Sequence, residues 1–375
     1  MSHLPRAGNL LALTSALAAA LLLTSLALPA SAGPTVGGYT RTVLQTGTAD
    51  FPDAFRVSTT GNPVNSSGLV AGSTVGGDFR APSVAALYNV NTGTWTDIGT
   101  LRGSADAAAA DVNEGGDVVG TGGTDIESGG PTLAFLWTLA RPTMYALGSL
   151  DAEDPNSGAT AINDHGVVVG WTYTPDSGYS GHAFVWDPTV KPVKMRDLGT
   201  LGGVDSVAYG INNAGTVVGS ATTRRRVVRP VIWSAGQHTV TDIGTLPGYD
   251  SGVARDVNDR GYVVGEDFNA ANPRQSRAFV WSPLTRTVTA LSTPSGLASR
   301  ATAINYHGVV VGQLDQPPLS GSSGPNTKAV IWNACSPLTV LPENYGAPTG
   351  ITRRERVVGS SEYGGTSWLK AGPCT

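Results

Sequence analysis

The chain has 375 residues, and its 24 Lys and Arg against 28 Asp and Glu give a formal net charge of −4 at pH 7. This balance lacks the basic footprint of a nucleic-acid-binding protein, so nucleic acid is excluded as a partner. Only 14% of the residues are charged while 49 are glycine, a composition that favours short strands and tight turns over helices.

Residues 1–32 predict a secretory signal peptide. Arg6 gives the basic start, residues 10–28 form an apolar stretch, and residues 30–32 (ASA) form a cleavage site of small residues. The alternative is an uncleaved membrane anchor, since the stretch is nearly long enough to span a bilayer. We expect cleavage, a secreted protein without membrane attachment, and a single domain over residues 33–375.

One eight-residue frame recurs seven times along the chain. It reads Asn, two variable residues, Gly, and an apolar run that closes on a second Gly. The last copy, which starts at Thr352, has lost the Asn and the first Gly. A fixed period of this length predicts a repeat architecture. The closing glycines are 46 to 50 residues apart, at Gly72, Gly120, Gly170, Gly219, Gly265, Gly312 and Gly359.

The third repeat shows the predicted unit most completely. Residues 157–163 form a first strand, a turn at 163–166 leads to a second strand at 167–169, and strands at 182–186 and 193–198 complete the unit. Asn, Asp and Gly favour the turn because they tolerate left-handed backbone, and the β-branched run that follows favours a strand. Four short antiparallel strands per repeat predict the blade of a β-propeller.

The two ends of the chain are predicted to close the ring. The last repeat, residues 349–369, has room for three strands, whereas residues 39–45 (YTRTVLQ) form a spare strand before the first unit. Pairing this strand with the last blade removes two open sheet edges. The predicted fold class is therefore all-β, a seven-bladed β-propeller of four-stranded antiparallel blades that its N-terminal strand closes.

An aromatic residue ends the third strand of every repeat. A repeated position of this kind indicates packing between blades, and we expect Trp186, taken as its representative, to be largely buried. A row of sugar-stacking rings is the alternative. The position is occupied by Tyr88, Trp137, Trp186, Trp233, Trp281, Trp332 and Trp368.

The two cysteines predict one disulfide. Cys335 follows the third strand of the sixth repeat, and Cys374 lies at the end of the seventh. An even number of cysteines in an exported chain favours a bond between them. Such a bond would fasten the C-terminal tail across adjacent blades.

Three phrases carry a family resemblance. They are DLGTLGG at residues 197–203, INNAGTVVG at 211–219 and HAFVW at 182–186. These phrases resemble the HAF-repeat family of extracellular bacterial repeat proteins, and the resemblance extends over nearly all of the chain after the leader. It departs at Tyr88, where the repeat has Trp, and around Thr352. The resemblance implies secretion and repetition, and it brings no catalytic residues.

The predicted binding surface is the face that holds the loops between second and third strands. These loops differ in length and sequence, whereas the turns between first and second strands are uniform, and recognition is usually found where a scaffold varies. The candidate ligand-binding residues are Trp171, Tyr173, Arg225 and Phe268. The first hypothesis is thus a monomeric, secreted, non-enzymatic binding or scaffold protein that recognises a glycan, a peptide or another protein.

Catalytic and metal signatures are absent from the sequence. There is no G-x-S-x-G, H-E-x-x-H or Walker motif, and Pro155 interrupts an acidic segment at 151–156 that otherwise resembles a calcium loop. No catalytic residue, metal or cofactor is therefore predicted. The alternative hypothesis is an extracellular propeller hydrolase or lyase with its site at the central pocket. Its first candidates, in or beside the innermost strands, are Asp111, Arg255, Asp256 and Arg300.

Overall fold

The computed structural model describes residues 24–26, 32–36, 39–44, 54–75, 83–101, 106–123, 130–175, 181–234, 239–316, 326–333, 338–341, 346–361 and 364–370. Within these residues every regular element is a β-strand. No helix in this part of the chain is long and apolar enough to cross a membrane.

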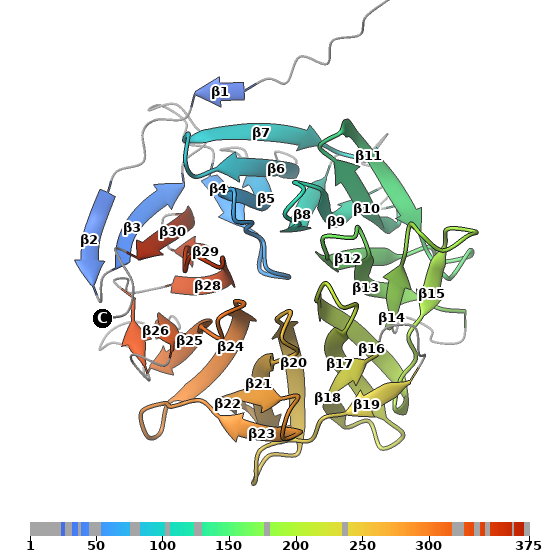
Figure 1. The fold of residues 1–375 in the computed structure, drawn as a ribbon. Coiled ribbons are helices and arrows are strands. Elements are labelled where there is room, and N and C mark those ends of the chain that lie inside the picture. The colour runs from blue at the N-terminus through green and yellow to red at the C-terminus, as the bar shows by residue number, and fades with distance from the viewer. Residues whose placement is uncertain are drawn as a thin grey trace, which may run out of the picture.

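The strands form seven antiparallel sheets that stand in a ring around a central axis (Figure 1). The first strand of blades 1 to 7 is innermost, and the last lies at the outer edge of the ring. This is the seven-bladed β-propeller that the repeat predicted, and the all-β fold class is confirmed.

The bounds of the first three blades follow the repeat closely. Blade 1 consists of β4 (Ala54–Val57), β5 (Leu69–Val75), β6 (Ser83–Asn89) and β7 (Thr94–Gly99). Blade 2 consists of β8 (Ala107–Val112), β9 (Val118–Gly123), β10 (Thr132–Thr138) and β11 (Arg141–Gly148). Blade 3 consists of β12 (Ser157–Ile162), β13 (Val168–Tyr173), β14 (Gly181–Trp186) and β15 (Met195–Asp197).

The remaining blades repeat this order. Blade 4 consists of β16 (Gly202–Ile211), β17 (Val217–Thr223), β18 (Val228–Trp233) and β19 (Val240–Asp242). Blade 5 consists of β20 (Ser251–Val257), β21 (Val263–Asn269), β22 (Asn272–Ser282) and β23 (Thr287–Ala290). Blade 6 consists of β24 (Ala298–Ile304), β25 (Val310–Gln316), β26 (Asn326–Trp332) and β27 (Thr339–Val340). Blade 7 consists of β28 (Gly346–Ile351), β29 (Val357–Ser361), β30 (Gly364–Lys370) and β3 (Tyr39–Leu44).

The N-terminal strand completes the last blade, as predicted. β3 pairs antiparallel with β30, from Tyr39 opposite Lys370 to Leu44 opposite Gly365. Tyr39 and Leu44 are each 1% exposed, so one end of the chain supplies core side chains to a blade built by the other end. Closure therefore rests on apolar burial as well as on the backbone ladder.

Two short strands lie outside the four-stranded pattern. β2 (Ala32–Val36) pairs with β3, and β1 (Thr24–Leu26) pairs with β7. β1 falls inside the predicted leader. Cleavage after Ala32 would remove β1 and leave four strands in blade 1, whereas blade 7 would keep residues 33–36 of β2 as a fifth strand. Cys335 and Cys374 of the predicted disulfide lie outside the described residues.

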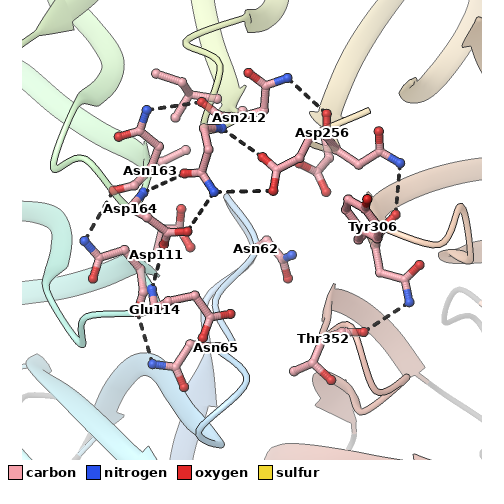
Figure 2. Close-up of a pocket in the computed structure, with 18 of the residues that line it drawn as sticks. Asn62, Asn65, Asp111, Glu114, Asn163, Asp164, Asn212, Asp256, Tyr306 and Thr352 are labelled. Carbon is pink, nitrogen blue, oxygen red and sulfur yellow. Dashed lines mark hydrogen bonds between the residues drawn. The ribbon is translucent and has the colours of Figure 1, made fainter. Parts of the chain in front are cut away.

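The asparagine that opens each frame joins neighbouring blades. In blade 4, the side-chain Oδ1 of Asn212 accepts the backbone N–H of Thr216 at 2.9 Å, and its Nδ2 donates to the backbone carbonyl of Asn258 at 3.0 Å. Both bonds recur in blades 1 to 6, and Figure 2 shows those that join neighbouring blades around one mouth of the ring. This asparagine belt consists of Asn65, Asn113, Asn163, Asn212, Asn258 and Asn305.

The left-handed backbone of each turn belongs to the glycine and not to the asparagine. Gly215 has a φ of +78°, and in the degraded last copy Glu355 occupies that place with a φ of +59°. The sequence predicted the asparagine for its tolerance of this conformation. The structure shows that its side-chain amide is needed for bonds within the turn and between blades.

The aromatic position packs as expected in some blades and not in others. Trp137, Trp233 and Trp368 are at most 2% exposed, which confirms packing between blades. Trp186 is only half-buried, so the prediction that it is largely buried is wrong. Phe184, two residues earlier on β14, is fully buried in the same cluster, and Trp186 packs against that cluster from its edge.

The Asp-x-Gly part of the family phrase has a local structural role. Asp197 accepts the backbone N–H of Gly199 at 2.7 Å, and Asp242 accepts that of Gly244 at 2.8 Å. Both glycines have positive φ, so the aspartate closes a tight turn at the end of the fourth strand. The phrase therefore encodes blade geometry and says nothing about a ligand.

Candidate functional site

The inner strands of blades 2 to 7 each contain a β-bulge at the same place. In blade 5, Ala254 pairs with Gly265 and Asp256 with Val264, which leaves Arg255 as the extra residue. A bulge turns such a residue away from the two faces of its strand. All six bulge residues line cavities of the central channel, and they are Ala110, Thr160, Tyr209, Arg255, Thr302 and Thr349.

The closing glycine of the frame lies against this bulged strand. A Cβ atom at Gly265 would overlap the backbone carbonyl oxygen of Val253, and the same overlap occurs at the other six closing glycines. Only glycine fits there, which explains why the frame always ends on it. The next residue along the second strand reaches the channel in several blades. Those that line its cavities are Ser73, Thr121, Trp171, Glu266 and Gln313.

Blade 1 replaces the one-residue bulge with a longer excursion. Val57 pairs with Gly72, and Ala71 donates its N–H to the carbonyl of Pro63, so residues 58–62 leave the strand. We call this segment the channel strap, and Figure 1 shows it entering the centre of the ring. It is the one inner-strand irregularity among the described blades that crosses towards other blades.

The strap is held at its far end by specific contacts. Asn62 donates its Nδ2 to the carbonyl of Ile351 at 3.2 Å and accepts the N–H of the same residue at 2.9 Å, which connects blade 1 to blade 7. Gly61 has a φ of +69°, and a Cβ atom there would lie 2.5 Å from the carbonyl oxygen of Thr160 and 2.9 Å from Cβ of Asp111. Glycine is therefore required where the strap passes blades 2 and 3.

Residues of the strap line three neighbouring cavities. The mouth cavity, about 410 Å³, is lined by the first-to-second-strand turns of all seven blades. The Arg255 cavity, about 160 Å³, lies among blades 4 to 7, and the Trp171 cavity, about 310 Å³, lies among blades 1 to 3. Thr59 and Thr60 of the strap line both of the smaller cavities. Bulge residues line both as well, so the two lie at the same level of the ring.

Asp111 and Asp256 line the mouth cavity and act as clamps between blades. Asp256 accepts the N–H of Val257 at 2.8 Å and, across the blade interface, that of Ile304 at 2.9 Å. Asp111 makes the equivalent pair of bonds, which reach Ile162 of the next blade. Both oxygens of each carboxylate are used by backbone groups, so neither aspartate can act on a substrate without releasing a blade contact.

Burial perturbs both aspartates strongly. Asp111 is 5% and Asp256 is 8% exposed. Burial raises the pKa of Asp111 to about 7 and that of Asp256 to about 6. The hydrogen bonds that each carboxylate accepts from backbone N–H groups lower its pKa, but by less than burial raises it. A shifted pKa is often the sign of a functional group, but here the geometry gives it a structural cause.

The Arg255 cavity contains the charged cluster of the channel. The Nη2 of Arg255 lies 2.6 Å from Oε1 of Glu266, and its guanidinium lies 4.9 Å from the centre of the Tyr209 ring. Arg300, from blade 6, pairs with Asp315 at 3.1 Å. Burial lowers the pKa of Arg255, but the charge and hydrogen bonds of Glu266 outweigh it and raise the pKa above its usual value. The cluster therefore presents permanent positive charge to the cavity.

Exposure separates the members of this cluster. The Glu266 side chain is 7% exposed, whereas those of Arg255 and Arg300 are 36% and 42% exposed. Glu266 thus holds Arg255 through an ion pair while it also lines the cavity, and the two guanidinium groups are the more accessible members of the cluster. An anionic group is the ligand that this arrangement suits, because arginine binds carboxylates through parallel N–H bonds.

The structure sorts the four residues of the alternative hypothesis into two places. Arg255 and Arg300 come together in one cavity, whereas Asp111 and Asp256 lie at the mouth. Sequence reasoning missed Tyr209 and Glu266. Their signal was the variation at two positions of an otherwise uniform frame: the residue three before the frame asparagine, and the residue just after the closing glycine.

The four predicted ligand-binding residues are only partly assembled. The rings of Trp171 and Tyr173 lie 5.9 Å apart on β13, and Trp171 lines its channel cavity. Arg225 is exposed in the turn between β17 and β18, and Phe268 is half-buried on β21. These two belong to blades 4 and 5, and neither lines the Trp171 cavity.

Comparisons with known proteins agree on the fold. No protein-family model matches the sequence, and no curated protein is significantly similar to it. Among solved structures, the chain is similar to an oligogalacturonate lyase of Vibrio parahaemolyticus, with 10% identity, 93% of this chain and 99% of that chain covered, and a TM-score of 0.54. An oligogalacturonate lyase in complex with manganese matches with 12% identity over 94% of this chain and 98% of that chain, at a TM-score of 0.53.

A third similar structure is the β-propeller domain of the Trilobed protease from Pyrococcus furiosus. It matches with 9% identity over 84% of this chain and 98% of that chain, at a TM-score of 0.50. At these identities the likeness shows the propeller fold alone. The three structures named here are two lyases and a domain of a protease.

These findings correct the first functional hypothesis. The three similar structures named above are two lyases and a domain of a protease, not non-enzymatic binding propellers. The central channel, and not the loop face, holds the charged cluster. The alternative, with its site at the central pocket, is the better interpretation.

Proposed function

We propose that the protein is a propeller enzyme, a hydrolase or lyase, whose site is the Arg255 cavity. The observation that carries this proposal is the meeting of Arg255, Glu266 and Tyr209 with Arg300 in one cavity of the channel. Cations, a carboxylate and a phenol placed together provide both charge stabilisation and proton transfer, the two needs of bond cleavage between sugars or acyl groups.

The lyase reaction on an acidic saccharide suits this cluster better than hydrolysis. A uronic acid carries its carboxylate beside the carbon whose proton is removed in elimination, and the two accessible guanidinium groups of Arg255 and Arg300 would bind that carboxylate. They would also stabilise the negative charge that develops on it as the proton leaves. Hydrolysis of a neutral substrate has no use for two arginines at the reacting centre.

The proton transfers can be assigned to the same cavity. Glu266 accepts the proton from the carbon next to the carboxylate, a carbon–carbon double bond forms, and the bond to the glycosidic oxygen breaks. Tyr209 donates a proton to that departing oxygen, and solvent returns the proton from Glu266 to Tyr209. The step consumes no water, oxidant or reductant, and its products are a saccharide with a free hydroxyl and an unsaturated uronate.

The described residues do not fit the metal that one similar lyase contains. That structure is a complex with manganese. In the described part of this chain, no group of three or more His, Cys, Asp or Glu is placed to hold a metal ion, and the carboxylate of the Arg255 cavity is already paired with a guanidinium. We therefore assign charge stabilisation to the arginines and route no step through a metal.

Four sequence predictions join this proposal. The signal peptide over residues 1–32, export from the cell and a Cys335–Cys374 disulfide remain our expectations for the protein, as does its membership of the HAF-repeat family. They are consistent with an enzyme that meets its substrate outside the cell. Mass spectrometry of the exported protein should find Ala32 as the last residue removed and no free thiol.

Turnover of acidic oligosaccharides tests the proposed function. The protein should be incubated with oligogalacturonates, other uronic acid oligomers and neutral oligomers, with ultraviolet absorbance of the unsaturated product and reducing ends measured together. A lyase raises both signals, and a hydrolase raises only the second. Arg255→Ala and Glu266→Gln should lower kcat/KM about 100-fold or more, whereas the exposed Arg225→Ala should not change it. Absence of both signals with every substrate would reject the proposal.

A further inference from the structure

The Arg255 cavity is too small to hold an oligosaccharide by itself. At about 160 Å³ it lies below the range of about 300–1,000 Å³ that is usual for small-molecule pockets. A longer substrate must therefore extend into a neighbouring space. The Trp171 cavity, about 310 Å³, lies beyond Thr59 and Thr60 of the channel strap at the same level of the ring.

Trp171 occupies the position in blade 3 that Glu266 occupies in blade 5. Both directly follow the closing glycine of their frame, and both face the channel. Trp171 is half-buried, unlike the fully buried tryptophans that pack between blades. It is not part of the aromatic position that repeats in every blade, so blade packing does not account for it.

The backbone holds the Trp171 ring in a defined place. A Cβ atom at Gly158 would lie 2.6 Å from Nε1 and 2.8 Å from Cε2 of the indole, so the ring lies against the bare backbone of β12. Tyr173 supports it from β13, with ring centres 5.9 Å apart and planes tilted by 47°. The platform is therefore oriented before any ligand binds, which lowers the entropic cost of binding.

Apart from Arg56, the remaining wall of this cavity has no charged side chain and is rich in hydroxyl groups. Ser58, Thr59, Thr60, Thr121 and Thr160 line it together with Trp171. Pockets that combine an aromatic surface with a few polar groups orient small ligands. A sugar ring matches both features of this cavity. Its C–H groups can cover an indole, and its hydroxyl groups can form hydrogen bonds with serine and threonine.

We infer that the Trp171 cavity is a second saccharide subsite, which stacks the sugar ring that is joined to the unit at the Arg255 cavity on the side away from the cleaved bond, so that a dimer does not reach it. This inference rests on the proposed function and specifies its substrate as an oligosaccharide of more than two units. The chain would pass across the strap, with its acidic unit against Arg255 and Arg300. The strap residues Thr59 and Thr60, which line both cavities, would lie beneath the bond that joins the two parts.

Chain-length dependence tests this subsite. Wild type, Trp171→Ala and Trp171→Phe should be assayed with acidic oligomers of two to six units. Trp171→Ala should raise KM for the longer oligomers about tenfold, leave kcat unchanged and leave the dimer unaffected. Trp171→Phe should restore most of the difference, because it keeps an aromatic face. An equal effect of Trp171→Ala on every chain length, or none on any, would overturn the inference.

A binding measurement separates the subsite from the proposed activity. Calorimetry should be carried out with a neutral glucose tetramer, which needs no cleavage and carries no carboxylate. We expect weak binding by wild type and by Arg255→Ala, and loss of binding in Trp171→Ala at an unchanged Tm. If wild type cleaves nothing but this pattern holds, the proposed function fails and the subsite stands. If the tetramer binds equally to wild type and Trp171→Ala, the subsite fails whatever the activity.

Discussion

The asparagine belt and the channel lining lie a few residues apart in every repeat, yet they follow opposite rules. The belt uses the same residue with the same two hydrogen bonds in blades 1 to 6. The channel lining consists of the bulge residue and the residue after the closing glycine, and both change from blade to blade. The bulge position by itself holds alanine, threonine, tyrosine or arginine.

The difference separates what assembles the ring from what the ring can do. Bonds between neighbouring blades must fit one geometry in each repeat, so one residue type serves everywhere. Side chains of the channel lining have no partner that is common to all blades: Thr160 and Thr302 bond to a carbonyl of the next blade, whereas Arg255 pairs with Glu266 of its own blade. Their differences give a side around Arg255 with two arginines and a glutamate and a side around Trp171 that is aromatic and rich in hydroxyl groups.

The largest effect is expected where the frame and the lining are adjacent in sequence. Gly265→Ala should lower the free energy of unfolding by about 3 kcal/mol or more, because its Cβ would overlap the carbonyl of Val253. The neighbouring Glu266→Gln should lower it by only about 1 kcal/mol, since Arg255 remains partly solvated, while turnover falls. Chemical denaturation together with the lyase assay measures both.

Gly115→Ala provides the control for the first substitution. Gly115 has ordinary backbone, and the nearest atom to its added Cβ would be the Asn113 Oδ1 at 3.3 Å. Its effect should stay within about 0.5 kcal/mol. A comparable loss in both variants would show that glycine content in general, and not the bulge contact, limits stability.

The next largest effect should be the pH dependence of stability that comes from Asp256, which joins two blades at the mouth cavity. The folded-state pKa of Asp256, about 6, lies above the usual 3.8 because the carboxyl is buried. The folded protein therefore holds this proton more tightly than the unfolded chain, and the stability that results is complete below about pH 4 and is lost as the pH rises through about 6.

Asp256→Asn removes this titration. Relative to wild type, the variant should gain up to about 3 kcal/mol between pH 4 and pH 8, although it is less stable at pH 4 because it loses one acceptor for a backbone N–H. Thermal unfolding of both proteins across that range measures the difference. A stability gap that stays constant or widens with pH would contradict the assignment.

The smallest of the three effects concerns the belt itself. Asn212→Ala should cost about 2 kcal/mol, since two bonds of a 5%-exposed amide are lost and the carbonyl of Asn258 keeps only the N–H of Gly261 as a donor. Asn213→Ala should cost well under 1 kcal/mol, because its bonds to Asp164 and Asp259 lie at the surface. Neither change should alter kcat in the folded protein. Reduced kcat in Asn212→Ala would connect the belt to the chemistry.

The sequence by itself determined the architecture. A period of 46 to 50 residues, a frame that ends on glycine and a spare strand at residues 39–45 were enough for the blade number and its closure, because propeller stability depends on contacts that repeat between neighbours. The arginines Arg255 and Arg300 could also be named, since inner strands must face a channel. The burial of Trp186 was overestimated, because the local sequence pattern does not show that Phe184 already fills the interior at that place.

Only the tertiary structure decided which side chains share a cavity. Glu266 comes from a second strand and Tyr209 from the preceding blade, and they meet Arg255 because a bulge turns its side chain into the channel. Residues 58–62 leave the inner strand of blade 1 and cross the channel, where Asn62 bonds to Ile351, 289 positions away. Such contacts depend on the closure of the ring, which brings together segments that no local pattern relates.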